Sequence, residues 1–242
     1  MQVVILAGGL GTRIRAISGS LPKALVPIAG VPFIFYQIEW LRKNRVTDVL
    51  VLTGYGASQI RDALNARFTG DGIGCCDEGA TLRGTAGALR YAGDQGLQQD
   101  SFILLYGDSY LPIEIGPLFR ASQSGRLPTM SVLRNDGRWD RSNVKFRSGR
   151  LELYDKHVDD PAGAGMMHID YGLSVLQNDL IERYVPAGGV MDLAEILTPL
   201  SRAGLLHGYE VTERFYEIGS VTGLQDFEAY VAAHPAIRPG SK

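Results

Sequence analysis

Short apolar runs alternate, over the first hundred residues, with longer segments in which apolar positions recur at helical spacing. The apolar runs predict strands near residues 2–7, 47–53, 72–77 and 101–106. The longer segments predict helices near residues 32–44, 56–68 and 84–97. This order is typical of parallel strands joined by right-handed crossovers, in which ligands bind beyond the carboxyl ends of the strands. The apolar residues of the first helix are expected to pack on the sheet: Phe33, Tyr36, Ile38, Trp40 and Leu41.

The pattern changes after residue 125, where short runs alternate between apolar and polar positions and are separated by Asn-Asp-Gly and Ser-Gly turns. These runs predict hairpin strands between about 127 and 176. Helices are expected near 178–185 and 190–203, and a last helix from 222. The chain is therefore predicted to be an α/β protein with a Rossmann-like, open and mostly parallel sheet flanked by helices, and a smaller β-rich portion.

A loop rich in glycine and positive charge follows the first predicted strand. Gly8, Gly9 and Gly11 allow the backbone to turn sharply and to present N–H groups to an anion. Arg13 offers a planar fork of donors suited to phosphate oxygens, and Lys23 adds a mobile point charge. Together these residues predict a polyphosphate-binding loop.

Two familiar phosphate loops do not fit this spacing. A dinucleotide fingerprint would place its third glycine where Ile14 stands, and no acidic residue closes the second strand near Thr53. A P-loop would place its lysine directly after a glycine, whereas Gly11 is followed by Thr12. A purely structural turn would not need three glycines together with an arginine and a lysine.

Composition and charge exclude several classes of protein. The 242 residues are 45% hydrophobic and 21% charged, which suffices for a sizeable core. The formal net charge of −2 offers no basic field for a nucleic acid partner. No apolar run approaches the roughly 18 residues of a membrane span, and Met1 leads straight into a strand, so we expect a cytoplasmic protein without membrane contact. The adjacent Cys75 and Cys76 suit neither a mutual disulfide nor a zinc site.

Motifs spread over nearly the whole chain resemble those of the sugar-1-phosphate nucleotidylyltransferases. They are LAGGLGTR and LPKALVPIAGVPFI near the start, RGTAGALR at 83–90, LLYGDSY at 104–110, YDK at 154–156, AEIL at 194–197 and FYEIGSVTGLQDFEAY at 215–230. Within the family, GTRIRAISGSLPKAL most resembles the heptose-1-phosphate guanylyltransferase type. The resemblance implies the nucleotide-diphospho-sugar transferase fold as a single domain over 1–242.

The resemblance also implies an activity and a division of labour along the chain. The expected reaction transfers a nucleoside monophosphate from an NTP to a sugar 1-phosphate and releases pyrophosphate, for which GTP and a heptose 1-phosphate are one candidate pair. A UTP-, CTP- or dTTP-dependent hexose-1-phosphate enzyme, or a non-catalytic nucleotide-sugar-binding homologue, stays open. Residues 1–125 would mainly bind the NTP, residues 126–220 the sugar phosphate, and 221–242 would form the C-terminal helix and tail. The oligomeric state, including a homo-oligomer, is left open.

The nucleotide is expected to contact the glycine loop and a second loop that reads the base. Glu78 and Thr85 can hydrogen-bond the edge of a base, and a carboxylate acceptor suits the N1–H and N2 amine of guanine. Arg13, Lys23 and Asp108 are the expected catalytic residues. The predicted nucleotide-binding residues are Leu6, Ala7, Gly8, Gly9, Gly11, Thr12, Arg13, Lys23, Glu78, Gly84 and Thr85.

A Mg²⁺ cofactor and a sugar-phosphate site complete the expectations. Asp108 follows the apolar run FILLY, and Mg²⁺ on a nucleotide prefers one or two carboxylates. The resemblance implies Asp108 as one metal ligand and Glu217 as the second, although the family has the shorter aspartate at the latter position. It further implies Lys156, Asp170, Gly172 and Glu195 as sugar-phosphate-binding residues. Arg138, Arg141 and Asn143 have no firm counterpart and are expected to form a branch-specific pocket.

Overall fold

The computed structural model describes residues 1–9, 11, 14–15, 19–123 and 127–240. Its chain forms two compact units, each with its own set of internal contacts. Unit 1 comprises Met1–Leu82, Leu105–Pro112 and Phe215–Lys242. Unit 2 comprises Arg83–Leu104 and Ile113–Arg214. Three separate segments of the chain thus make up unit 1, so residues far apart in sequence belong to one unit.

Parallel strands form the sheet of unit 1. Strand β1 (Gln2–Leu6) pairs in parallel with β4 (Asp48–Thr53), which pairs in parallel with β5 (Ile73–Asp77). The other neighbour of β1 is β6 (Ser101–Tyr106), whose last two residues belong to unit 1. Nearly every position of β1 and β4 is buried, which is why their sequences are continuous apolar runs. The four strands predicted from these runs are confirmed.

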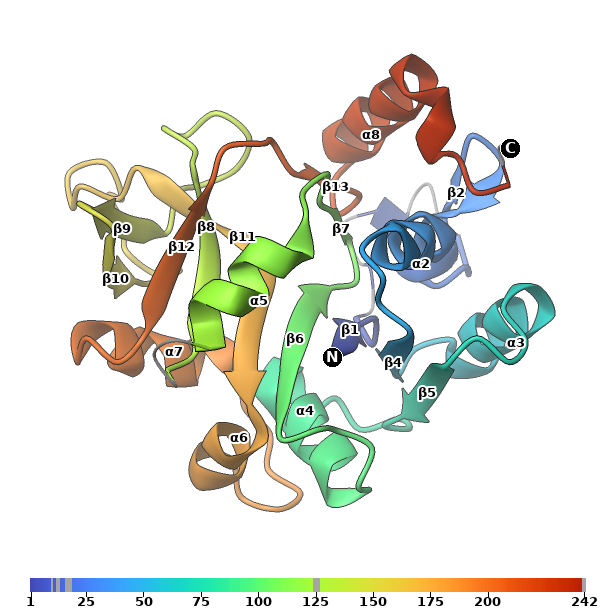
Figure 1. Cartoon of the computed structure of the whole chain (residues 1–242), viewed down its shortest axis with the longest axis horizontal. Helices are drawn as coiled ribbons and strands as arrows, with labels where there is room; N and C mark the ends of the chain where they lie inside the picture. The colour runs from blue at the N-terminus through green and yellow to red at the C-terminus, as the bar shows by residue number, and fades with distance from the viewer. Residues whose placement is uncertain (10, 12–13, 16–18, 124–126, 241–242) are drawn as a thin grey trace. The chain divides into compact units, whose positions relative to one another are not determined.

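Helices and short ladders complete unit 1. Helix α2 (Phe33–Lys43) contacts the 3-10 helix η2 (Lys23–Leu25), and α3 (Ala57–Arg67) contacts β5 (Figure 1). Two small antiparallel ladders join β2 (Pro27–Ile28) to β3 (Val31–Pro32) and β7 (Ser109–Tyr110) to β13 (Tyr216–Glu217). The last elements are α8 (Val221–Ala233) and the 3-10 helix η3 (Pro235–Ile237).

Aromatic rings fill the core between α2 and α8. The ring centroid of Phe227 lies 5.3 Å from that of Phe33, 5.5 Å from that of Tyr36 and 4.9 Å from that of Tyr110. Burial raises the pKa of the Tyr110 phenol, with Tyr230 and Tyr36 acting in the same direction, so Tyr110 stays neutral. All five apolar residues of α2 named in the sequence analysis are buried, which confirms that they belong to the core.

Unit 2 contains the β-rich portion expected after residue 125. Strand β11 (His168–Gln177) runs antiparallel to β8 (Thr129–Arg134) on one side and to β9 (Val144–Arg147) on the other. Strand β9 forms the predicted hairpin with β10 (Arg150–Tyr154), and its Ser148–Gly149 turn has positive φ at both residues. Strand β12 (His207–Val211), which the sequence pattern did not indicate, pairs in parallel with β8.

Helices also pack within unit 2 (Figure 1). Helix α4 (Gly84–Asp94) contacts α6 (Asn178–Tyr184) and α7 (Leu193–Arg202), and α7 also packs on β10. Helix α5 (Ile115–Gln123), which was not predicted, packs on β11 and β12. The predicted fold class is confirmed: α/β, with an open sheet flanked by helices. No described helix is both long and apolar enough to span a bilayer.

Candidate functional site

The glycine loop begins where β1 ends, in unit 1. The N–H of Ala7 still donates to the carbonyl of Leu52 at 2.8 Å, and the chain then leaves the sheet. A Cβ on Gly8 would lie 2.6 Å from Oε1 of Glu78, so the glycine admits the Glu78 carboxylate against the loop. The structure therefore brings Glu78 and Gly8 together at the carboxyl ends of β1 and β5. Thr12 and Arg13, two predicted members of this loop, lie outside the described residues.

Lys23 and Asp108 form an ion pair in the same unit. Nζ of Lys23 donates to Oδ2 of Asp108 at 2.6 Å, and the two side chains are 16% and 34% exposed. The pair is therefore partly shielded from water but still open to a ligand. Two of the three predicted catalytic residues are thus in contact, although 85 positions separate them in the sequence.

Close approach of two strand ends brings Asp108 to this position. The N–H of Gly107 donates to the carbonyl of Leu6 at 3.0 Å, and a Cβ on Gly107 would collide with that carbonyl. Only glycine allows the end of β6 to lie this close to the end of β1. Asp108 therefore leaves the sheet directly beside the beginning of the glycine loop.

A buried glutamine, which sequence reasoning missed, holds the turn that carries Asp108. Nε2 of Gln37 donates to the carbonyls of Tyr106 at 3.0 Å and Ser109 at 2.8 Å. Gln37 is fully buried on α2, where its neighbours are apolar. A lone amide in the run FIFYQIEWL was the signal that could have identified it, because a buried amide requires hydrogen-bond partners.

Glu217 lies beside the Asp108 turn, and its carboxylate bonds to the two residues that precede α8. The N–H of Ile218 donates to the carbonyl of Asp108 at 2.9 Å, which places the two segments next to each other. The Glu217 carboxylate accepts hydrogen bonds from Ser220 Oγ at 2.5 Å and from the N–H of Gly219. Ser220 is itself the N-cap of α8. Glu217 thus has a local partner for each carboxylate oxygen.

The donor set of Asp108 fits a Mg²⁺ ion. Asp108 already attracts an ammonium group to Oδ2, and one carboxylate is sufficient when phosphate oxygens and waters supply the other ligands. Each carboxylate oxygen of Glu217 accepts one hydrogen bond from a residue just before α8. The described residues contain no cluster of three or more metal-binding side chains. A metal-ligand role for Glu217 stays a prediction.

Gly84 and Thr85, two members of the second predicted nucleotide loop, pack within unit 2. A Cβ on Gly84 would lie 2.5 Å from the carbonyl of Met191, and the N–H of Ala86 donates to that carbonyl at 3.0 Å. The hydroxyl of Thr85 accepts from the N–H of Leu193 at 2.7 Å and donates to Asp192 at 3.3 Å. The absence of a side chain at Gly84 therefore serves packing within unit 2. Base contact by Gly84 and Thr85 stays a prediction.

Glu195 takes part in the capping of a helix. Its Oε1 accepts from the N–H of Asp192 at 2.8 Å, and the two residues form a capping box at the start of α7. The sequence contains a signal for this capping box, because an acidic residue three positions before a glutamate commonly marks the start of a helix. The carboxylate predicted to bind sugar hydroxyls thus has a structural role in α7, and its sugar contact stays a prediction.

The predicted phosphate-binding lysine stands on a pinned turn after β10. The carboxylate of Asp155 accepts from the N–H of His157 at 2.9 Å and from Nη2 of Arg202 at 2.7 Å. These two bonds fix the turn on both sides of Lys156. Nζ of Lys156 lies 5.8 Å from the centroid of the Tyr154 ring, over its face.

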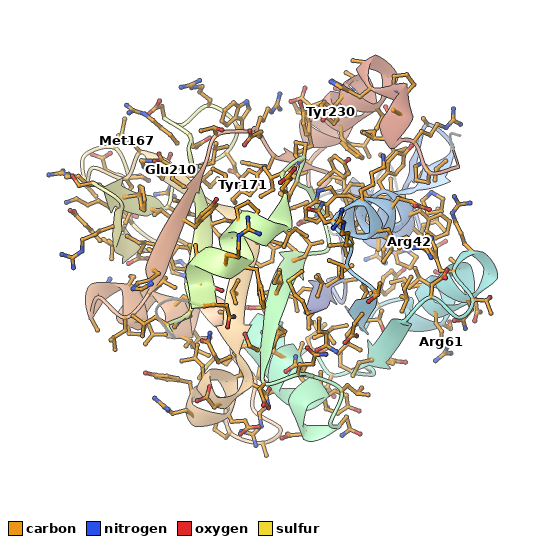
Figure 2. All side chains as sticks on the ribbon, viewed as in Figure 1. Arg42, Arg61, Met167, Tyr171, Glu210 and Tyr230 are labelled. Atoms are coloured by element: carbon orange, nitrogen blue, oxygen red, sulfur yellow. The ribbon has the colours of Figure 1, made fainter. Side chains whose placement is uncertain are left out.

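The two predicted sugar contacts on β11 lie in a β-bulge. Asp170 pairs with Val132 and Ser174 with Met130, so β11 contains two more residues than β8 over this stretch. Gly172 has φ of +90°, and its N–H donates to Oδ1 of Asp170 at 3.0 Å. The residue between them, Tyr171, is buried (Figure 2). Bulges often redirect side chains beside binding sites, which agrees with a site at Asp170.

Comparison with known proteins identifies a family and a fold. The family model described as nucleotidyl transferase matches residues 2–132. A D-glycero-alpha-D-manno-heptose 1-phosphate guanylyltransferase of Aneurinibacillus thermoaerophilus is 31% identical over 119 residues, which are 49% of this chain and 51% of that protein. A probable mannose-1-phosphate guanylyltransferase 2 of Arabidopsis thaliana is 38% identical over 195 residues, 76% of this chain and 52% of that protein. The chain thus spans about half the length of these curated relatives.

Solved structures agree with the fold over almost the whole chain. The crystal structure of HddC from Yersinia pseudotuberculosis matches with a TM-score of 0.77 at 25% identity, covering 95% of this chain and 98% of that one. The inositol-1-phosphate CTP transferase from T. maritima matches with a TM-score of 0.79 at 18% identity, covering 100% of this chain and 97% of that one. At such low identity the second likeness concerns the fold alone.

Proposed function

Because this chain belongs to the nucleotidyl transferase family, we propose that it transfers a nucleoside monophosphate from an NTP to a sugar 1-phosphate and releases pyrophosphate. The observation that carries the proposal is the Lys23–Asp108 pair, 2.6 Å long, beside the glycine loop. An ammonium group suits the phosphate oxygens of the NTP, and the carboxylate suits its metal ion. Both lie where α/β sheets bind ligands, beyond the carboxyl ends of parallel strands.

The reaction requires alignment and charge neutralisation rather than an acid–base side chain. A phosphate oxygen of the sugar 1-phosphate is already a nucleophile, and it attacks the α-phosphorus in line with the departing pyrophosphate. No covalent intermediate on the protein is needed. Lys23 and Arg13 bind the phosphates and stabilise the charge that develops on them, and Lys156 holds the phosphate of the acceptor. Asp108 would hold Mg²⁺, which when bound neutralises phosphate charge.

GTP with a heptose 1-phosphate is the substrate pair we propose. The relatives from Aneurinibacillus thermoaerophilus and Arabidopsis thaliana are both named as guanylyltransferases, and their named sugars share the manno configuration. The Glu78 carboxylate beside Gly8 is an acceptor suited to the N1–H and N2 amine of guanine. Other relatives carry other names, among them a glucose-1-phosphate thymidylyltransferase of Streptomyces antibioticus, so the pair must be tested against alternatives.

A pyrophosphate-release assay tests both the reaction and the pair. It crosses GTP, UTP, CTP, dTTP and ATP with heptose-, mannose-, glucose- and N-acetylglucosamine-1-phosphates, with Mg²⁺ present or chelated. We expect one dominant pair, loss of activity on chelation, and a fall of roughly 100- to 1000-fold in turnover for Lys23→Ala and for Asp108→Asn, the scale of one electrostatic stabiliser. The exposed Lys43→Ala and Asp62→Asn make the same chemical changes away from the pair and should retain full turnover.

Two outcomes would contradict the proposal. Full turnover in both Lys23→Ala and Asp108→Asn would show that the pair does not contact the reacting groups. A wild-type protein that binds GTP in calorimetry but releases no pyrophosphate with any sugar phosphate would be a non-catalytic homologue.

A further inference from the structure

Asn143 lies just before the middle strand of the arrangement β10-β9-β11 in unit 2. It directly precedes β9, which lies between the other two strands. Its backbone N–H donates to the carbonyl of His168 on β11 at 3.0 Å. Its carbonyl accepts from the N–H of Asp155, just beyond β10, at 2.9 Å. The backbone of one residue therefore joins the turn that carries Lys156 to β11.

The side chain of Asn143 makes a third bond, which fixes the orientation of its amide. Oδ1 accepts from the backbone N–H of Asp170 at 2.9 Å. An N–H donor can pair only with the oxygen of a carboxamide, so the amino group must face away from Asp170. Over the described ranges of the chain, Nδ2 of Asn143 donates to no protein acceptor. It is half-buried and available to a ligand.

Neighbouring residues hold Asn143 rigidly. Ser142 Oγ accepts from Nδ2 of the fully buried Asn135 at 3.0 Å. The Arg141 guanidinium donates to the carbonyls of Val158 and Asp159, the latter at 2.7 Å, and so attaches the segment after Lys156 to the same loop. The two residues that precede Asn143 thus have fixed partners of their own, which contributes to the preorganisation that a specific contact requires.

We propose that Asn143 is a specificity-determining residue that binds the sugar 1-phosphate through Nδ2. This inference rests on the proposed function. The amino group donates a hydrogen bond to an oxygen of the acceptor, while the backbone and Oδ1 of Asn143 hold the Lys156 turn and Asp170 at fixed positions. An amide combines these tasks because it accepts on one side and donates on the other without adding charge. An aspartate would keep the acceptor for Asp170 but would repel the phosphate.

Replacing Asn143 with aspartate removes the Nδ2 donor but keeps an oxygen that accepts from the N–H of Asp170. Asn143→Asp keeps the size of the side chain and an oxygen for the N–H of Asp170, so we expect the melting temperature to stay near that of wild type. We expect the KM for the sugar 1-phosphate to rise roughly 10- to 100-fold, the effect of losing one hydrogen bond to a charged group, with the KM for the NTP unchanged. The exposed Asn65→Asp on α3 adds the same charge elsewhere and should change neither KM.

Calorimetric titration distinguishes failure of this inference from failure of the proposed function. The probe is whichever of the heptose, mannose, glucose or N-acetylglucosamine 1-phosphates the wild-type protein binds most tightly. Weaker binding to Asn143→Asp, with unchanged GTP binding, supports the inference. Equal binding to Asn143→Asp and wild type overturns it and leaves the proposed function intact. Absence of binding to wild type for all four sugar phosphates overturns both.

Discussion

Replacing Gln37 with methionine keeps the volume of a fully buried side chain but removes both of its hydrogen bonds. Nε2 of Gln37 donates to the carbonyls of Tyr106 and Ser109, one on each side of Asp108. Methionine has no donor, so both carbonyls lose this partner. The substitution therefore tests whether the Asp108 turn is held from beneath by α2.

The expected magnitude follows from the two carbonyls that lose a donor and from Oε1 of Gln37. Each carbonyl that loses its donor costs about 1–3 kcal/mol of stability. Oε1 of Gln37 is itself buried without a hydrogen-bond partner among the described residues, and removing it regains about 1–3 kcal/mol. The net loss in the free energy of unfolding should be about 1–3 kcal/mol. A displacement of about 1 Å at Asp108 would lower turnover roughly 100-fold.

Urea unfolding and pyrophosphate release measure these two effects in one preparation. The matched control is Gln59→Met, which makes the same change at an exposed position of α3 and should leave both quantities unchanged. The reasoning is refuted if Gln37→Met has wild-type turnover and a free energy of unfolding within about 0.5 kcal/mol of wild type, the range of ordinary surface substitutions.

Three further predictions concern Gly107, the start of α8 and Cys75. Gly107→Ala forces a Cβ against the carbonyl of Leu6, so we expect a loss of about 1–3 kcal/mol in urea unfolding and lower turnover, and unchanged values would contradict the close approach of β6 and β1. Ser220→Ala removes the N-cap of α8 and should cost about 1 kcal/mol, measured by thermal unfolding, whereas an exposed Ser58→Ala on α3 should cost less. Burial raises the pKa of the Cys75 thiol, with Arg61 acting in the opposite direction, so the thiolate is scarcer in the folded protein. In a Cys76→Ala background, iodoacetamide at about pH 8 should therefore alkylate the native protein more slowly than the urea-unfolded one, and equal rates would contradict this burial.

The strands β1 and β4 of unit 1 could be predicted from the sequence because they are buried on both faces. Parallel strands of this kind are short continuous apolar runs, and β4 was expected at 47–53 and observed at Asp48–Thr53. Helix α4 shows the limit of such reasoning at element ends. It was expected to reach residue 97 but ends at Asp94, where the N–H of Gln95 bonds back to Tyr91 and Gly96 takes a positive φ.

Elements that depend on tertiary contacts could not be predicted in the same way. Helix α5 contains Gly116 and Pro117, which indicate a turn when read locally, but proline is favoured in the first turn of a helix. Strand β12, HGYEV, has little apolar character and forms because β8 offers it an edge. The ladder of β7 and β13 pairs residues over a hundred positions apart, and each strand has only two residues.

The residues of the candidate site also differ in how far the sequence could predict their roles. Asp108 follows β6 almost directly, so the parallel topology brings it to the edge of the sheet beside the glycine loop, where it pairs with Lys23. Glu195 and Glu217 differ, because a glutamate near a helix start has a backbone role available to it. Both carboxylates accept from N–H groups within three residues of their own position. A motif match therefore identifies a ligand more securely at Asp108 than at either glutamate, since the carboxylate of Asp108 accepts no hydrogen bond from a helix-start N–H among the described residues.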